Sequence, residues 1–217
     1  MITMLDAAAP GHGRLPWPTP GSLGSRARAV HDAITGGPRA SGPRLFSVAT
    51  DDGRLEGPFN AMLTAPEVGL ALQELGARIR YGSTLSDRVR EIAILVVAAH
   101  HRSDYEWYAH EAMGRAVGLS EDEISALQHQ DTAISFDVAE ATTIDLVRSL
   151  LTNRLVHDTT MTRAIESLGI ERITELVVLV GYYELLDLLM RTWETPLPSG
   201  ISSPFGRGSV GQEASNV

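Results

Sequence analysis

The amino-acid sequence predicts a single all-α domain with flexible ends. Apolar residues recur at helical spacing through most of the chain, and no stretch shows the alternation of apolar and polar residues that is typical of a β-strand. In addition, Ser followed three residues later by Glu, a signature of helix starts, occurs before two of the expected helices. A hydrophobic content of 43% in 217 residues is sufficient for a substantial core.

The two ends of the chain differ from the region between them. Residues 1–24 are rich in Gly and Pro without apolar periodicity, and residues 199–217 are similar. We therefore expect a flexible N-terminal arm over 1–24, one helical domain over 25–198 and a flexible C-terminal tail over 199–217. A Pro-rich arm is also suited to wrapping around a neighbouring subunit.

The domain is expected to begin with two helices separated by a loop. A short helix over 26–35 is stopped by the Gly-Gly-Pro sequence at 36–38. Residues 53–66 are typical of a structured loop. The second helix then starts at Pro66, a residue favoured in the first helical turn, and ends near Gly82.

The following helix, over 87–102, is expected to form the centre of the domain. Thr84 and Asp87 mark its start, and from Val89 to Ala99 its apolar side chains cover most of its circumference. A helix that is apolar nearly all round is buried on every side.

Five further helices complete the domain. Ser103 with Glu106, and Ser120 with Glu123, each form the capping-box signature that starts a helix, and the first of these helices ends at Gly118. Three more helices follow, over 138–153, 159–169 and 171–193.

An internal similarity predicts two pseudo-repeated halves. Residues 88–99 resemble a later helical segment in which Arg172 corresponds to Arg88 and Glu175 to Glu91. The later segment lacks a counterpart of the candidate site described below, so only one half is expected to carry a site.

The composition excludes several kinds of chemistry. The chain has no Cys, and all 18 of its basic residues are Arg. This excludes thiol nucleophiles, disulfides, Cys-ligated metals, Schiff bases and the lysine of a phosphate-binding loop. A net charge of −9 disfavours nucleic acid as a partner.

A membrane protein is not expected either. The longest apolar stretch, 176–190, contains Glu184 and Asp187 and is shorter than the ~20 apolar residues that a membrane span requires. The first residues lack the basic head and apolar run of a secretory signal. We therefore expect a cytoplasmic protein.

Glu106 and His110 are the first candidates for a functional site. Four residues apart on a helix, they are neighbours, so the carboxylate can hold the imidazole and leave its other nitrogen to take or give a proton. The same spacing also occurs as ordinary helix decoration, worth only about 0.2–0.5 kcal/mol. Spacing alone favours decoration over catalysis.

Glu91 and the aromatic residues beside the pair extend the candidate site. Glu91 lies in the apolar helix, so it needs a partner there. The partner is either the site, if the two helices fold back on each other, or one of Arg88, Arg90 and Arg172. Tyr105 and Trp107 are candidates to stack on a flat substrate, although aromatic residues on a helix are more often core or subunit contacts. No His spacing typical of a metal site occurs, so no metal is expected.

The segment RVREIAILVVAAHHRSDYEWYAHEAMGRAVGLSEDEISAL closely resembles the core of the carboxymuconolactone decarboxylase family, an all-helical group that includes the alkylhydroperoxidase-like proteins. The resemblance covers roughly residues 45–198. Peroxidase-like members carry CxxC before the His, and those cysteine positions fall here on Ser103 and Glu106. The resemblance therefore implies the decarboxylase-like branch and makes Glu106 and His110 more plausible as a working pair.

The resemblance implies a cofactor-independent lyase that acts on a small carboxylated lactone or another enolisable ring compound. In this interpretation His110, held by Glu106, gives a proton; Glu91 orients or relays; and Arg88 binds the substrate carboxylate. It also implies a homo-oligomer, with a trimer or hexamer preferred. Two alternatives stay open: a catalytically silent binding or assembly protein that keeps the fold, and an isomerase or hydrolase that uses the same acid and base.

Overall fold

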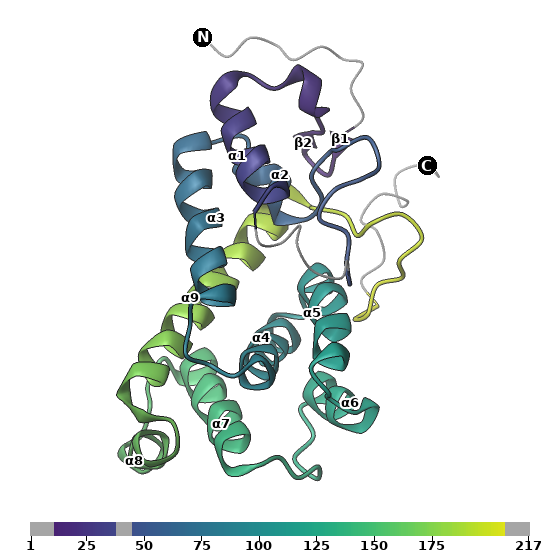
Figure 1. Cartoon of the computed structure of the whole chain (residues 1–217). Coiled ribbons are helices and arrows are strands. Elements are labelled where there is room, and N and C mark those ends of the chain that lie inside the picture. Colours follow the sequence, from purple (N-terminus) through teal and green to yellow (C-terminus); the bar gives the residue numbers. More distant parts are fainter. Residues whose placement is uncertain (1–10, 38–44, 207–217) are drawn as a thin grey trace. The chain divides into compact units, whose positions relative to one another are not determined.

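The computed structural model describes residues 11–37 and 45–206, and over these ranges the chain is mostly helical (Figure 1). It divides into two compact units. One is formed by Arg78–Asp187, and the other by the residues that flank this segment on both sides. The prediction of an all-α fold is confirmed.

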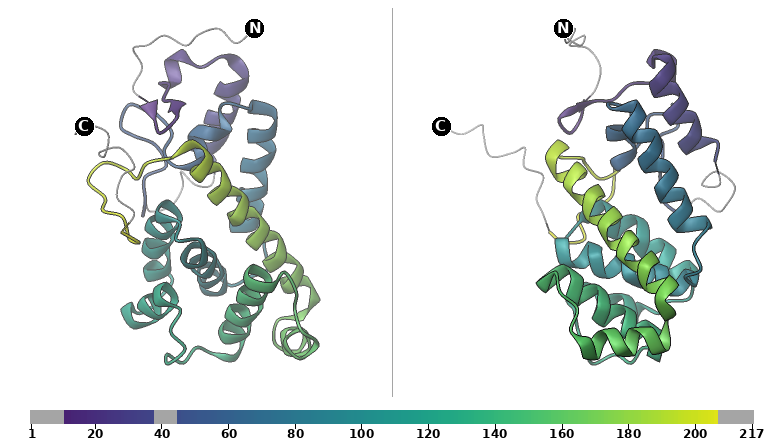
Figure 2. Two further views of the ribbon diagram at one scale, coloured as in Figure 1. Left: turned by 180° about the vertical axis from the view of Figure 1, so that it is seen from behind. Right: turned by 90° about the vertical axis from the view of Figure 1, so that its left-hand side faces the viewer.

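The unit formed by Arg78–Asp187 contains the helices that position the candidate site. They are the last turn of α3 (Pro66–Tyr81), α4 (Asp87–His101), α5 (Asp104–Ala116), α6 (Glu121–His129), α7 (Val138–Asn153), α8 (Asp158–Ser167) and most of α9 (Gly169–Trp193). Helix α4 contacts α5, α6 and α7, and α7 lies beside α8 (Figures 1 and 2).

Helix α4 lies at the centre of this unit, as its composition predicts. Every residue from Val89 to Ala99 is buried. The helix starts at Asp87 as predicted, but its N-cap is Ser86 rather than Thr84, and the Ser86 hydroxyl accepts a hydrogen bond from the backbone N–H of Val89. Thr84 instead binds Glu175, since its backbone N–H and its hydroxyl donate to that carboxylate at 2.9–3.0 Å.

Both helices predicted from a capping-box signature start where expected, but only one of them has the capping box itself. Ser120 and Glu123 form the expected capping box at α6. Ser103 is the N-cap of α5, but its side chain makes no capping hydrogen bond. Glu106 therefore does not complete a capping box. Its carboxyl group instead approaches His110 inside the unit.

The flanking unit contains the only described strands, β1 (Gly11–His12) and β2 (Leu15–Pro16), which pair antiparallel. No strand is predicted here from the sequence, because strands of two residues are too short to show an alternation of apolar and polar residues. The backbone N–H of Arg14 donates to Trp193 O at 2.7 Å, and the side chain of Arg14 pairs with Glu194. Of the predicted flexible ends, residues 1–10 and 207–217 lie outside the described residues.

The remaining elements of the flanking unit are the 3-10 helix η1 (Pro20–Ser22), α1 (Ser25–Thr35), α2 (Pro58–Met62) and most of α3. Two of them are not predicted, and η1 is the first, because it lies in the segment expected to be a flexible arm. The region predicted as a structured loop over 53–66 contains the short helix α2. Among the described residues, no helix combines the length and apolar character needed to cross a membrane.

Candidate active site

The turn between α4 and α5 brings Glu91 and His110 together. Helix α4 ends at Arg102, which adopts a left-handed conformation (φ 51°), and α5 begins directly after Ser103. The chain therefore reverses within two residues. His110 Nδ1 lies 2.6 Å from Glu91 Oε2, and these side chains are 4% and 0% exposed. The expected approach of the two helices is confirmed.

Glu106 lies on the other side of the imidazole ring. Its Oε2 is 3.5 Å from His110 Nε2, whereas the contact between Glu91 and Nδ1 is shorter by almost 1 Å. The carboxylate that holds the ring is thus Glu91, and not Glu106 as the sequence analysis expected. One carboxyl group faces each ring nitrogen, and the second oxygen of Glu106, Oε1, is buried without a hydrogen-bond partner among the described residues.

Two groups that the sequence analysis did not assign complete the surroundings of the ring. Tyr183 from α9 contacts His110 edge to face, with ring centroids 5.1 Å apart. Arg80, in the last turn of α3, is close enough for its charge to act on Glu91, Glu106, His110 and Tyr183. No local spacing connects either residue with the pair, because both are distant in sequence.

Arg90 is the second positive charge near Glu91. Its Nε lies 3.7 Å from Glu91 Oε1, and its guanidinium also pairs with Asp87 at 2.7 Å. From the sequence, the predicted partner of Glu91 is either an Arg or the candidate site. The structure combines both, because the two oxygens of this carboxylate face different partners.

The ionisation of the three central groups follows from burial and charge. Burial alone would raise the pKa of Glu91, but His110, Arg80 and Arg90 outweigh this effect, so the pKa lies below its ordinary value and Glu91 is ionised. Burial lowers the pKa of His110, which leaves the ring neutral at pH 7. A neutral ring that donates Nδ1–H to Glu91 presents a lone pair at Nε2.

The pKa of Glu106 is shifted in the opposite direction from that of Glu91. Burial, followed by the negative charge of Asp187, raises the pKa of Glu106 from 4.5 to about 8, and only Arg80 opposes this shift. At neutral pH its carboxyl group is therefore protonated. Two carboxyl groups in one site, one ionised and one neutral, are an arrangement typical of acid–base catalysis.

Arg88 does not lie at this site. Its guanidinium pairs with Glu140 and Glu123 and donates to Gly118 O at 2.5 Å. These contacts tie the start of α4 to α6 and α7. A substrate carboxylate would have to displace them, so the geometry does not support the substrate-binding role expected for Arg88.

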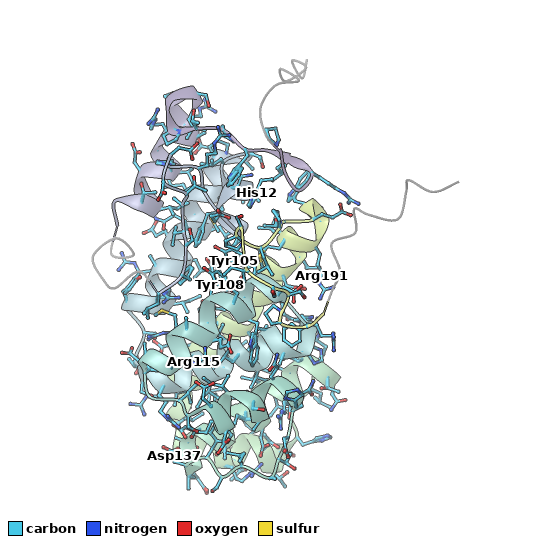
Figure 3. The ribbon with its side chains drawn as sticks, turned by 90° about the vertical axis from the view of Figure 1, so that its right-hand side faces the viewer. His12, Tyr105, Tyr108, Arg115, Asp137 and Arg191 are labelled. Atoms are coloured by element: carbon cyan, nitrogen blue, oxygen red, sulfur yellow. The ribbon has the colours of Figure 1, made fainter. Side chains whose placement is uncertain are left out.

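Tyr105 and Trp107 are core residues in this structure. They are 5% and 1% exposed. Tyr105 contacts Tyr108 edge to face at 6.0 Å, and Figure 3 shows both near the beginning of α5. The aromatic ring against the imidazole is Tyr183, so neither expected residue is placed as a stacking surface. Among the described residues, no group of three or more His, Asp or Glu side chains is arranged to hold a metal ion.

Comparison with known proteins identifies one matching family pattern. The sequence pattern of the carboxymuconolactone decarboxylase family matches residues 66–148. None of the curated proteins matches the chain.

Solved structures share the fold at low sequence identity. The alkylhydroperoxidase AhpD core of an uncharacterized peroxidase-related protein from Ralstonia eutropha JMP134 superposes with a TM-score of 0.69 at 13% identity, covering 88% of this chain and 95% of that one. A protein of unknown function from Agrobacterium tumefaciens gives 0.59 at 16% identity, covering 66% and 99%. The debrominase Bmp8 gives 0.62 at 10% identity, covering 81% and 87%, and a variant of it was solved with 2,3,4-tribromopyrrole. The fold is therefore alkylhydroperoxidase-like.

Proposed function

We propose that the protein is a cofactor-independent lyase acting on a small carboxylated lactone or another enolisable ring compound, because the sequence pattern of the carboxymuconolactone decarboxylase family matches residues 66–148. One observation carries this proposal: the His110 ring lies between the buried carboxyl groups of Glu91 and Glu106, and their surroundings lower the pKa of Glu91 and raise that of Glu106. Such a site holds a proton ready for transfer at neutral pH without any added group.

The proposed reaction needs few protein groups. Loss of carbon dioxide from the carbon beside an unsaturated lactone leaves a dienolate, because the ring accepts the electron pair. Glu106 then gives its proton to carbon, and the O–H bond of the acid is replaced by a C–H bond of the product. Glu91 orients His110, whose Nε2 in turn holds the Glu106 proton in place. Arg80 replaces Arg88 as the cation proposed to hold the substrate carboxylate.

The comparisons bear on the class of substrate. The debrominase that shares the fold was solved with a small substituted aromatic ring, 2,3,4-tribromopyrrole. A planar ring compound of similar size therefore suits the proposal. A thiol peroxidase does not, because the chain has no Cys. An isomerase or hydrolase that uses the same acid and base is the nearest enzymatic alternative.

A catalytically silent protein is the competing proposal from another class. Burial favours it: the side chains of Glu91, His110 and Glu106 are 5% exposed or less. In that case the cluster would stabilise a fold without meeting a substrate. Activity measurements on a variant that replaces a carboxyl group with an amide, such as Glu106→Gln, distinguish the two proposals.

The test is release of carbon dioxide, with NMR identification of the product, from carboxymuconolactone and related acidic lactones. We expect turnover by the wild type and a loss of about 10²- to 10⁴-fold in kcat for Glu106→Gln, because this change removes only the transferable proton. Glu111→Gln is the matched control, since Glu111 lies on the same helix and binds Arg115 at the surface. Absence of turnover with every lactone would exclude a lactone as the substrate of the proposed lyase, and equal rates in both variants would exclude Glu106 as the proton donor.

We also propose that the protein forms a homo-oligomer through α9. Ile170, Val177, Val178 and Leu185 are 42–72% exposed and lie along one side of this helix, which has no charged residue between Glu175 and Glu184. An exposed apolar stripe is typical of an interface, and a second copy presents the same stripe.

Light scattering tests the assembly. The wild type is expected to have the mass of a trimer or hexamer, and Val178→Glu combined with Leu185→Glu is expected to have the mass of one chain. Glu171→Ala, an exposed change on the same helix, should keep the wild-type mass. A monomeric wild type at micromolar concentration would contradict this proposal.

A further inference from the structure

Tyr183 is a buried aromatic residue to which the proposed reaction assigns no role. Its ring lies against the His110 ring edge to face, with centroids 5.1 Å apart and an angle of 88° between the two planes. Only 3% of its surface is exposed, and burial raises the pKa of its hydroxyl well above the ordinary value. The phenol is therefore neutral at neutral pH, and its contact with the imidazole is one between two rings.

The two carboxyl groups beside His110 do not by themselves fix the plane of the imidazole. Glu91 Oε2, 2.6 Å from Nδ1, holds one ring atom, but a hydrogen bond weakens steeply only when its angle falls below about 120°. Glu106 Oε2 is 3.5 Å from Nε2, which is longer than the ~2.7–3.2 Å of an ordinary hydrogen bond between nitrogen and oxygen. The ring could therefore tilt at Nδ1 and carry Nε2 away from Glu106, unless another group holds its plane.

The ring of Tyr183 is suited to hold this plane. A perpendicular contact places the positive edge of one ring against the negative face of the other, so it is favourable only over a limited range of orientations. Tyr183 is itself restrained on α9, because the ring of the neighbouring Tyr182 lies edge to face with it at 5.4 Å and 84°. Both tyrosines are buried. The imidazole thus contacts a ring that is held in place by a second ring.

The internal similarity of the chain places these rings at positions where the other segment has none. When residues 88–99 are aligned with 172–183, Tyr182 and Tyr183 correspond to Ala98 and Ala99. An Ala side chain is a single methyl group and makes no ring contact. The segment without a counterpart of the acid–base pair therefore has an aromatic ring at the one position that meets His110.

We infer that Tyr183 is a positioning residue for the proposed reaction: its ring holds the plane of the His110 imidazole, so that Nε2 stays directed at Glu106. The inference rests on the proposed function, in which Nε2 holds the Glu106 proton in place. The aromatic ring carries this role, and the hydroxyl group has no part in it. Phe in place of Tyr183 should therefore be sufficient, whereas an aliphatic side chain should not.

The test is nitrogen NMR spectroscopy of the histidine side chains in the purified full-length protein, with His110→Gln used to assign the His110 signals. No substrate is needed. Tyr183→Phe removes only the hydroxyl and should leave both ring nitrogens at their wild-type chemical shifts. Tyr183→Leu removes the ring. We expect its Nε2 signal to move toward that of a nitrogen without a hydrogen bond, while Nδ1, which is bonded to Glu91, keeps its chemical shift.

Leu176→Ala is the matched control for the loss of buried volume. Leu176 is fully buried on the same helix, about two turns before Tyr183, and its truncation also leaves space in the core. It should lower the midpoint of urea unfolding, as Tyr183→Leu does, without moving either His110 signal. An Nε2 signal that is the same in the wild type and Tyr183→Leu, or that moves equally in Leu176→Ala, would overturn the inference.

With a lactone that is turned over, the kinetics give a second result. Tyr183→Leu should lower kcat by about 10- to 100-fold and leave KM nearly unchanged, because a misdirected proton donor slows the chemical step rather than binding. Tyr183→Phe should have the wild-type kcat. An equal loss in both variants would assign the role to the hydroxyl, and a raised KM with unchanged kcat would assign Tyr183 to substrate binding. Either result would contradict the positioning role.

These outcomes are distinguishable from failure of the proposed function. If no lactone releases carbon dioxide but the Nε2 signal moves in Tyr183→Leu alone, the lactone reaction fails and the positioning of the ring stands. If carbon dioxide is released but the Nε2 signal does not move, the lyase stands without this role for Tyr183.

Discussion

Replacing Glu106 with Gln is expected to stabilise the folded protein by an amount that grows as the pH rises. The pKa of this buried carboxyl group is raised from 4.5 to about 8. Below pH 4.5 the group is protonated in both the folded and the unfolded chain. As the pH rises toward 8 the unfolded chain ionises while the folded chain must keep the proton, so stability is lost.

The magnitude follows from how far the pKa is raised. A tenfold change in an acid dissociation constant corresponds to about 1.4 kcal/mol, so the free energy of unfolding should differ by on the order of 4 kcal/mol at pH 8.5. Gln has nearly the same shape and no charge to bury. Urea unfolding at pH 5 and pH 8.5 measures the difference, which should be small at the lower pH. A variant that is less stable than the wild type at pH 8.5 would contradict this assignment.

Glu91→Gln is the matched comparison and should have the opposite sign. Because the pKa of Glu91 lies below its ordinary value, its contribution is present above pH 4.5 and is lost as the pH falls through the lowered pKa. The variant also weakens the bond from His110 and removes the negative charge beside Arg90. It should therefore be less stable than the wild type at neutral pH. The two isosteric changes in one cluster are thus expected to change the free energy of unfolding in opposite directions.

The second large effect is expected at Arg88, and it concerns stability rather than substrate binding. Arg88→Met leaves Glu140, whose side chain is 6% exposed, without its partner and removes the contacts with Glu123 and Gly118 O. Loss of one partner of a buried ion pair destabilises by about 3–5 kcal/mol, and the 28% exposure of Arg88 favours the lower end, about 3 kcal/mol.

Arg115→Met provides the control for Arg88. Arg115 also binds two carboxylates, Glu111 and Glu121, but it is 43% exposed and lies at the surface (Figure 3). Its loss should change the midpoint of urea unfolding very little. If Arg88→Met unfolded at the wild-type urea concentration but raised KM for a turned-over lactone, Arg88 would be a substrate ligand after all.

The sequence was sufficient to predict most of the helices, because those helices have a local cause. The apolar residues of α4 require burial on every side, and Ser120 with Glu123 starts α6 through contacts within one turn. The second capping box, Asp137 with Glu140 at α7, follows the same local rule and could have been found. Strands of two residues carry no such signal.

The candidate site could be predicted only where local pattern and tertiary contact agree. Glu106 satisfies two local patterns, the capping box after Ser103 and the pair with His110, and local rules do not decide between them. The burial of Glu106 decides in favour of the pair with His110, because a buried carboxyl group needs a polar partner such as the imidazole nearby. Arg80 and Tyr183 reach the ring from distant parts of the sequence, so no spacing within one helix could identify them.

The two segments that the sequence analysis pairs, residues 88–99 and 172–183, place their corresponding carboxylates in different surroundings. Glu91 is fully buried against His110, whereas Glu175 receives the backbone N–H of Thr84, and Arg172 donates to Thr84 O at 3.2 Å. In one half the carboxylate orients an imidazole. In the other it fixes the loop that leads into α4, the helix on which Glu91 lies.

The uncapped start of α5 has a consequence for access to the buried pair. Helices α4, α6 and α7 each have a side-chain cap, from Ser86, Ser120 and Asp137, whereas α5 has none. A side-chain cap contributes about 1 kcal/mol of helix stability, and the first turn of α5 lacks this contribution. Glu106 lies in that turn and His110 one turn further on. In the proposed function, brief local unfolding of this turn would be the route by which a ring compound reaches an acid that the folded helix covers.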